Sequence, residues 1–134
     1  MQNILYRLQA LYQFYKSAHW LSKGATFYQD HLLFEKLYSG IDEEMDALVE
    51  LTISTDSGEG FEPKTILLEA AKLMPQFGDT QTNLKNAANL EEDLLTIIQE
   101  IDSKTISAGL YNHLAAIAQS HTSKGYLLER VIND

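Results

Sequence analysis

His19, His31, Asp46 and Glu50 have the residue types and the spacing of a metal site. The histidines are twelve residues apart, and one helical turn separates the two carboxylates. The chain has no cysteine, so imidazole and carboxylate groups are the ligands it offers to a transition metal. Such donors suit iron or manganese, and they also accept zinc. The set predicts a site for metal oxidation.

The carboxylates share one stripe with His31 on a predicted helix. At about 100° per residue, Glu35, Asp46 and Glu50 fall within roughly 100° of His31 on the helical wheel. The opposite side is apolar and comprises Leu33, Phe34, Leu37, Ile41, Met45 and Leu48. A solvated acidic surface, extending to Asp42, Glu43 and Glu44, is the alternative explanation of the carboxylates.

The spacing along this helix points to a site shared between subunits. His31 and Asp46 are 15 residues apart, which is about 22 Å of helix. An antiparallel two-fold pairing would place His31 of one subunit beside Asp46 and Glu50 of the other, twice per dimer. The Glu-x-x-His pairs of di-iron sites inside bundles are absent, because no glutamate lies three residues before any histidine.

Helical periodicity predicts four long helices, at residues 2–21, 27–53, 83–101 and 106–132, and a short one at 63–73. Gly24 marks the end of the first helix, and Thr26 with Gln29 has the form of a capping box for the second. The polar stretch STDSGEG ends the second helix, and residues 75–82 form a linker. Residues 1–134 are therefore predicted to form one all-α domain. Its architecture is a ferritin-like four-helix bundle with a short extra helix between the second and third long helices.

The composition excludes several classes of protein. The net charge of -9 disfavours DNA binding through phosphate neutralisation. No apolar run is long enough to span a membrane, and the N-terminus lacks the pattern of a secretory signal. The absence of cysteine fits a cytoplasmic protein. His121 lies on the apolar stripe of the last helix and is expected to be a hydrogen-bonded interior residue, whereas His113 receives no role.

The segment HWLSKGATFYQDHLLFEKLYSGIDEEMDALVE, residues 19–50, closely resembles the signature of the Dps family, the mini-ferritins. The shared pattern has His-Trp, a nearby Lys-Gly, an aromatic pair, a second histidine twelve residues after the first, and two acids spaced by four. The stretch HTSKGYLLERVI is similar to the last helix of the family. The order and length of the helices agree along nearly the whole chain.

This resemblance implies a shell of twelve subunits that oxidises Fe(II), preferably with hydrogen peroxide, and stores ferric mineral. The ferroxidase site would lie at each two-fold interface. His19 and His31 would come from one subunit, and Asp46 and Glu50 from its partner. Glu35 matches a position that helps to form a second, weaker iron site.

Trp20 matches the aromatic residue beside that site, although tryptophan at such a position is more often part of a core. Two other functions remain open. A DNA-protecting member would need basic ends, which this chain does not show, and a helical assembly protein could keep the fold without catalysis.

Overall fold

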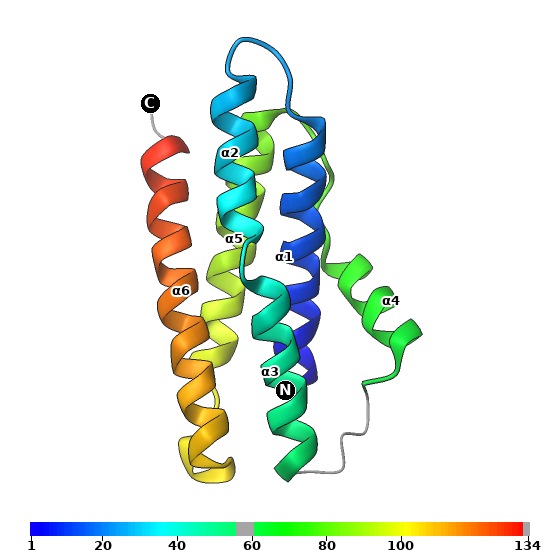
Figure 1. Ribbon diagram of the computed structural model, residues 1–134, viewed down its shortest axis with the longest axis vertical. Helices are drawn as coiled ribbons and strands as arrows, with labels where there is room; N and C mark the ends of the chain where they lie inside the picture. The colour runs from blue at the N-terminus through cyan, green and yellow to red at the C-terminus, as the bar shows by residue number, and fades with distance from the viewer. Residues whose placement is uncertain (56–60, 133–134) are drawn as a thin grey trace.

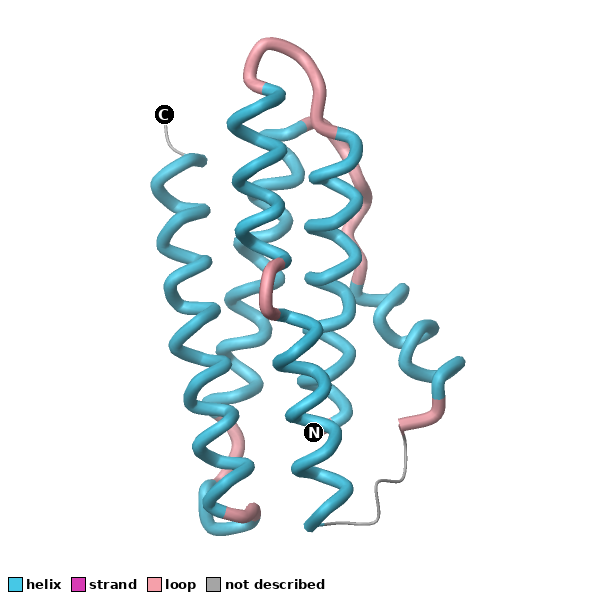
Figure 2. The backbone as a smooth tube through the Cα atoms, viewed as in Figure 1, coloured by secondary structure: helices cyan, strands magenta, loops and turns pink. Residues whose placement is uncertain are grey.

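Long helices aligned side by side form the molecule, with a short helix on its flank (Figures 1 and 2). The computed structural model describes residues 1–55 and 61–132. The elements are α1 (Gln2–Leu21), α2 (Phe27–Tyr38), α3 (Ile41–Thr55), α4 (Pro63–Leu73), α5 (Thr80–Gln99), the 3-10 turn η1 (Ser103–Thr105) and α6 (Ala108–Ile132). Within these ranges there is no strand, which confirms the all-α fold class.

The helices follow a crossover topology. α1 and α2 are antiparallel neighbours, and α3 continues the direction of α2 (Figure 1). α4 packs against α1, and the chain then returns to the end of the bundle at which α2 begins, so that α5 runs parallel to α2 and α3. α6 is antiparallel to α5. This arrangement is the predicted ferritin-like bundle with a short helix in the long connection.

Apolar side chains at helical spacing fill the centre of the bundle. The fully or almost fully buried residues include Leu8, Leu11, Phe14, Phe34, Leu37, Leu48, Leu84, Leu94, Leu114, Ile117 and Leu128. Each such side chain contributes about 1.5–3 kcal/mol by leaving water. Of the apolar stripe predicted for residues 27–53, Phe34, Leu37, Ile41 and Leu48 are buried, and Leu33 and Met45 are partly buried against the core. No helix in the described ranges is long and apolar enough to cross a membrane.

The second long helix is broken, which corrects the continuous helix predicted at residues 27–53. α2 ends at Tyr38 and α3 begins at Ile41. Between them Gly40 has φ +86°, a left-handed conformation that glycine adopts without steric cost and that ends helices. The Ser39 amide and hydroxyl both bond the Glu35 carbonyl, at 3.1 and 2.8 Å. The break lies between the two predicted groups of ligands.

The start of α5 and the cap of α2 differ from the prediction, although α2 begins at Phe27 as expected. α5 begins earlier than expected because the carboxylate of Asp79 accepts a 2.8 Å hydrogen bond from the Thr82 amide and caps the helix. The predicted capping box at Thr26 is wrong, since its hydroxyl donates to Asp30 at 2.7 Å and caps no amide. α4 has the predicted bounds, and residues 56–60 of the polar stretch lie outside the described residues.

Candidate metal centre

His19 and His31 hold each other in place at one end of the bundle. His19 is near the end of α1 and His31 is in the second turn of α2, so the short turn between these helices brings them together. His19 Nδ1 lies 2.8 Å from the His31 carbonyl oxygen, and His31 Nδ1 lies 2.9 Å from the His19 carbonyl oxygen. Their rings are stacked, with centroids 3.7 Å apart and planes 21° apart.

This reciprocal bonding settles which nitrogen of each ring is available. A carbonyl oxygen only accepts hydrogen bonds, so each Nδ1 must carry the proton. In the neutral imidazole the unprotonated nitrogen is then Nε2, which is free to bind a metal. A backbone carbonyl on the other nitrogen is the usual way in which proteins fix the tautomer and orientation of a metal-binding histidine.

Aromatic side chains surround the histidine pair. Phe27 stacks on His31 with centroids 5.1 Å apart, and Tyr38 meets His19 edge-on at 5.5 Å. Trp20 is 61% exposed, so it is not a core residue. The pair is thus partly shielded by its own chain and bordered by an exposed indole.

The predicted carboxylates lie on exposed helix surfaces. Glu35 is one turn after His31 on α2, and Asp46 and Glu50 are on α3. The carboxylates of Asp46 and Glu50 form no hydrogen bond or ion pair with any residue that the structure describes. They are therefore available to a ligand or to another molecule, although the break at Gly40 separates their helix from the one that carries His31.

One chain does not assemble the predicted ligand set. Across residues 1–55 and 61–132, no group of three or more histidine, aspartate or glutamate side chains is placed to hold a metal ion. The structure brings His19 and His31 together and leaves Asp46 and Glu50 apart from them. Each chain thus presents two nitrogen donors in one place and two oxygen donors in another.

A buried polar chain crosses the middle of the bundle. The Tyr15 hydroxyl donates to Glu91 Oε1 at 2.6 Å, and His121 lies between two carboxylates. Its Nδ1 is 2.6 Å from Glu91 Oε2 and its Nε2 is 2.8 Å from Glu44 Oε1. The expectation that His121 is a bonded interior residue is confirmed, and the assignment of Glu44 to a solvated surface is corrected.

The pKa values of the residues in and beside this buried polar chain are shifted by burial and by the neighbouring charges. Burial alone would lower the pKa of His121, but the hydrogen bonds and charges of Glu44 and Glu91 together raise it. A ring with a carboxylate at each nitrogen can donate to both only as imidazolium. Burial also lowers the pKa of Lys124, while the same two carboxylates oppose that shift. Burial, followed by the charge of Glu91, raises the pKa of Tyr15 well above its usual value.

The residue type of Glu91 does not distinguish it from the other glutamates, but its position among apolar residues indicates that it is buried. It lies seven residues after Leu84, four after Ala87 and three before Leu94, all of which are buried. A glutamate on an apolar stripe requires a partner, because an unpaired buried charge is costly. The isolated His121 on the facing helix was the available partner.

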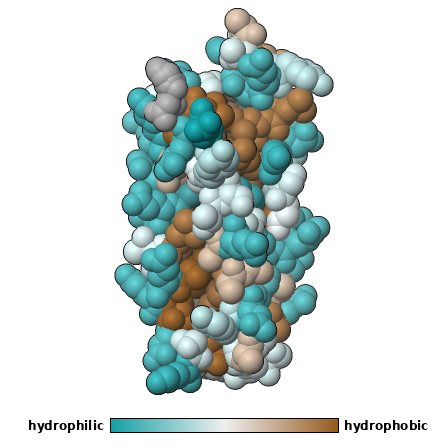
Figure 3. Space-filling model, turned by 90° about the vertical axis from the view of Figure 1, so that its left-hand side faces the viewer, coloured by the Kyte–Doolittle hydropathy of each residue, from teal (hydrophilic) through white to brown (hydrophobic). Residues whose placement is uncertain are grey.

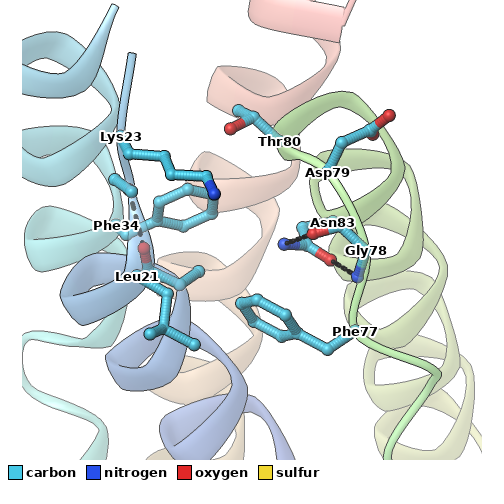
Figure 4. A pocket seen from close by; sticks show the side chains of 10 residues that line it. Leu21, Lys23, Phe34, Phe77, Gly78, Asp79, Thr80 and Asn83 are labelled. Carbon is cyan, nitrogen blue, oxygen red and sulfur yellow. Dashed lines mark hydrogen bonds between the residues drawn. The ribbon is translucent and has the colours of Figure 1, made fainter.

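A pocket of about 190 Å³ lies near the same end of the bundle as the histidines (Figure 4). Lys23, Phe34 and Phe77 border it, together with the start of α5. The amide side chain of Asn83 in this pocket is fully used, because it bonds the Gly78 amide and carbonyl at 2.8 and 3.0 Å. The pocket therefore presents no unpartnered buried polar side chain to a ligand.

Comparison with known proteins adds family and fold. Residues 1–124 match the model of the ferritin-like domain family. A 50-residue stretch is 44% identical to an uncharacterized protein in the bpoA2 5' region of Kitasatospora aureofaciens, covering 37% of this chain and 33% of that protein. The match thus spans about a third of that relative.

Three solved structures share the fold over nearly the whole chain. Dps from Thermosynechococcus elongatus has a TM-score of 0.83 and 23% identity, covering 98% of this chain and 86% of its own. An archaeal Dps homologue from Halobacterium salinarum has a TM-score of 0.83 and 21% identity, covering 99% and 77%. Dps from Microbacterium arborescens in the high iron form has a TM-score of 0.78 and 17% identity, covering 99% and 90%.

Proposed function

Because the chain belongs to the ferritin-like domain family, we propose that it is a Dps-type mini-ferritin. It oxidises Fe(II) at sites shared between two-fold related subunits and stores the ferric product in a hollow shell of twelve subunits. His19 and His31 supply nitrogen ligands from one subunit, and Asp46 and Glu50 supply oxygen ligands from its partner.

One observation carries this proposal. The Nδ1 atom of each histidine donates a hydrogen bond to the main-chain carbonyl of the other, which leaves the unprotonated Nε2 atom of both rings to bind a metal. A pair of interior histidines serving only the fold would not need two nitrogens free of partners. Both histidines are partly exposed, so a ligand from outside the chain can reach them.

The donor set fits iron in both oxidation states. Carboxylate oxygens bind Fe(II) and the harder Fe(III), and imidazole adds affinity. Glu35, one helical turn from His31, assists a second, weaker iron site in this proposal. In the proposed reaction two Fe(II) ions lose one electron each. Hydrogen peroxide accepts both electrons, its O–O bond breaks, and two hydroxide ions form.

Exposed apolar side chains around the histidine pair favour a neighbouring subunit there. Trp20, Leu21, Phe27, Tyr28 and Leu32 are each at least 40% exposed, and all lie on α1, on α2 or in their connecting turn. Contiguous exposed apolar surface commonly marks an interface. Apolar surface also lies between hydrophilic side chains on the face shown in Figure 3. A shell needs more than one contact surface on each subunit.

The test is anaerobic mixing of Fe(II) with hydrogen peroxide, followed by the absorbance of the ferric product. His31→Ala and Asp46→Ala should each abolish saturable oxidation. Asp93→Ala, which removes an exposed aspartate from α5, should react like the wild type. Light scattering checks that each variant assembles. Full activity in the combined His31→Ala and Asp46→Ala variant would overturn the site assignment.

A further inference from the structure

The break between α2 and α3 raises the question of what fixes the direction of α3. The break separates His31 and Glu35 from Asp46 and Glu50. A continuous helix would set the relation between these groups by its own geometry, but Gly40 interrupts it with φ +86°. The position of the carboxylates must therefore be set by contacts with another element.

α6 supplies such contacts on both sides of the break. Before it, Lys124 Nζ lies 3.5 Å from the carbonyl oxygen of Ser39. After it, His121 Nε2 is 2.8 Å from the carboxylate of Glu44, and His113 Nε2 donates to the main-chain carbonyl of Glu44 at 2.9 Å. We call His113, His121 and Lys124 the α6 clamp. It holds the last residue before the break and the first turn of the next helix.

The α6 clamp is a buried network of paired charged groups, which favours one arrangement of the helices. His121 is fully buried and Lys124 is 8% exposed, and their charges are balanced by Glu44 and Glu91. Apolar residues of similar size would often stabilise a helical bundle as well as such a cluster does. A buried network in which every group has a partner favours one position of α3, because any shift of this helix would leave a buried charge without its partner.

We propose that the α6 clamp is a positioning device for the metal site. It sets the direction in which α3 leaves the break, and thereby the place at which Asp46 and Glu50 meet the histidines of the neighbouring subunit. Glu44 transmits this effect, since it precedes Asp46 by two residues on the same helix. The inference rests on the proposed function, because it assumes that Asp46 and Glu50 bind metal.

A double-mutant cycle with Co(II) tests the metal part of this proposal. Co(II) affinity and its visible spectrum are measured for the assembled protein with and without His121→Asn. Both measurements are repeated in an Asp46→Ala and Glu50→Ala background. We expect at least a tenfold loss of affinity and a changed spectrum when the carboxylates are present, and no change when only the histidines remain. Equal losses in both backgrounds, or no loss in either, would overturn the proposal.

A distance measurement tests the direction of α3 without metal. The chain has no cysteine, so spin labels can be attached at Gln29→Cys on α2 and Ile53→Cys on α3, diluted with unlabelled subunits. His121→Asn or, if that variant fails to fold, Lys124→Met should shift or broaden the distance distribution. An unchanged distribution would overturn the clamp.

Two controls separate the possible failures. Leu94→Ala removes a fully buried side chain from α5, and it should lower stability while leaving Co(II) affinity and the label distance unchanged. If the Asp46→Ala and Glu50→Ala pair leaves Co(II) affinity unchanged with the clamp intact, the proposed metal site itself is wrong. The label distance then decides separately whether the clamp orients α3.

Discussion

Tyr15 on α1 donates a 2.6 Å hydrogen bond to Glu91 on α5, joining two residues that are 76 positions apart in the sequence. Both side chains are buried. The other carboxylate oxygen of Glu91 is bonded to His121, so the phenol forms one end of the buried polar chain. The hydroxyl of Tyr15 is therefore part of the charge balance of the core.

Removing that hydroxyl should cost stability. In Tyr15→Phe one buried oxygen of Glu91 loses its donor, and hydrogen bonds to charged groups are worth about 1.5–3 kcal/mol. We expect the free energy of unfolding to fall by about that amount in denaturant titrations. Tyr111→Phe, at an exposed position on α6, should change it by no more than about 0.5 kcal/mol. Equal effects from both variants would contradict this role.

The stability of the protein should depend on pH through His121. Its pKa is raised in the folded state, so folding favours the proton. The resulting stability is complete below the unfolded pKa, about 6.5, and is lost as the pH rises through the folded value. The free energy of unfolding should thus decrease from pH 6.5 upward, until His121 has lost its proton.

Unfolding at fixed protein concentration over this pH range checks the prediction, since assembly also affects apparent stability. Tyr15, Glu44, Glu91 and Lys124 all face the same cluster. The decline should be absent in His121→Gln, which keeps those neighbours and has no titrating ring. A wild-type curve that rises over this interval would show that His121 does not control it.

Gly40 should be hard to replace. A side chain in the left-handed region costs about 1–2 kcal/mol, so Gly40→Ala should lower the free energy of unfolding by that amount, even though no atom lies within 4 Å of the added methyl group. Gly125 is a matched control inside α6 with equally open space. Gly125→Ala should stabilise the protein by about 0.5–1 kcal/mol. The two changes should have opposite signs in denaturant unfolding.

Mixed assemblies should recover activity that neither parent has. One subunit type carries His19→Ala and His31→Ala, and the other carries Asp46→Ala and Glu50→Ala. Each type alone should be inactive. In a mixed dimer one of the two sites receives all of its natural ligands, so random pairing of equal amounts restores about a quarter of the wild-type sites.

The number of active sites is measured by Fe(II) oxidation after co-expression with two different affinity tags. A site contained within one subunit would give no recovery on mixing. Recovery well below a quarter in particles that contain both tags would likewise contradict the two-fold arrangement.

Hydrophobic periodicity was sufficient to predict the bundle but not its break. Leu37, Ile41, Met45 and Leu48 maintain helical spacing across Gly40, so the apolar pattern continues where the helix does not. A glycine within such a pattern is compatible with an intact helix. Gly40 can adopt its positive φ without steric cost, but the apolar spacing does not show whether the chain uses that freedom.

The histidine pair was predicted more fully than the buried chain. His19 and His31 flank a turn with strong local signals, so their proximity follows from an α-helical hairpin. Glu44 directly follows Asp42 and Glu43 in an acidic run, and only the packing of α3 against α6 separates its role from theirs. The meeting of Asp46 and Glu50 with the histidines stays a prediction, because it depends on a second copy of the chain.

Because His19 and His31 hold each other in place, the segment between them must keep its length in any variant that retains the histidine pair. Substitutions between residues 22 and 26 can change the composition of the turn, except at Gly24, whose φ of +93° favours glycine. A change in the length of this turn would shift α1 relative to α2, and both imidazoles would then lose their main-chain acceptors together. Most of these few residues should therefore tolerate substitution, whereas a change in their number should not be tolerated.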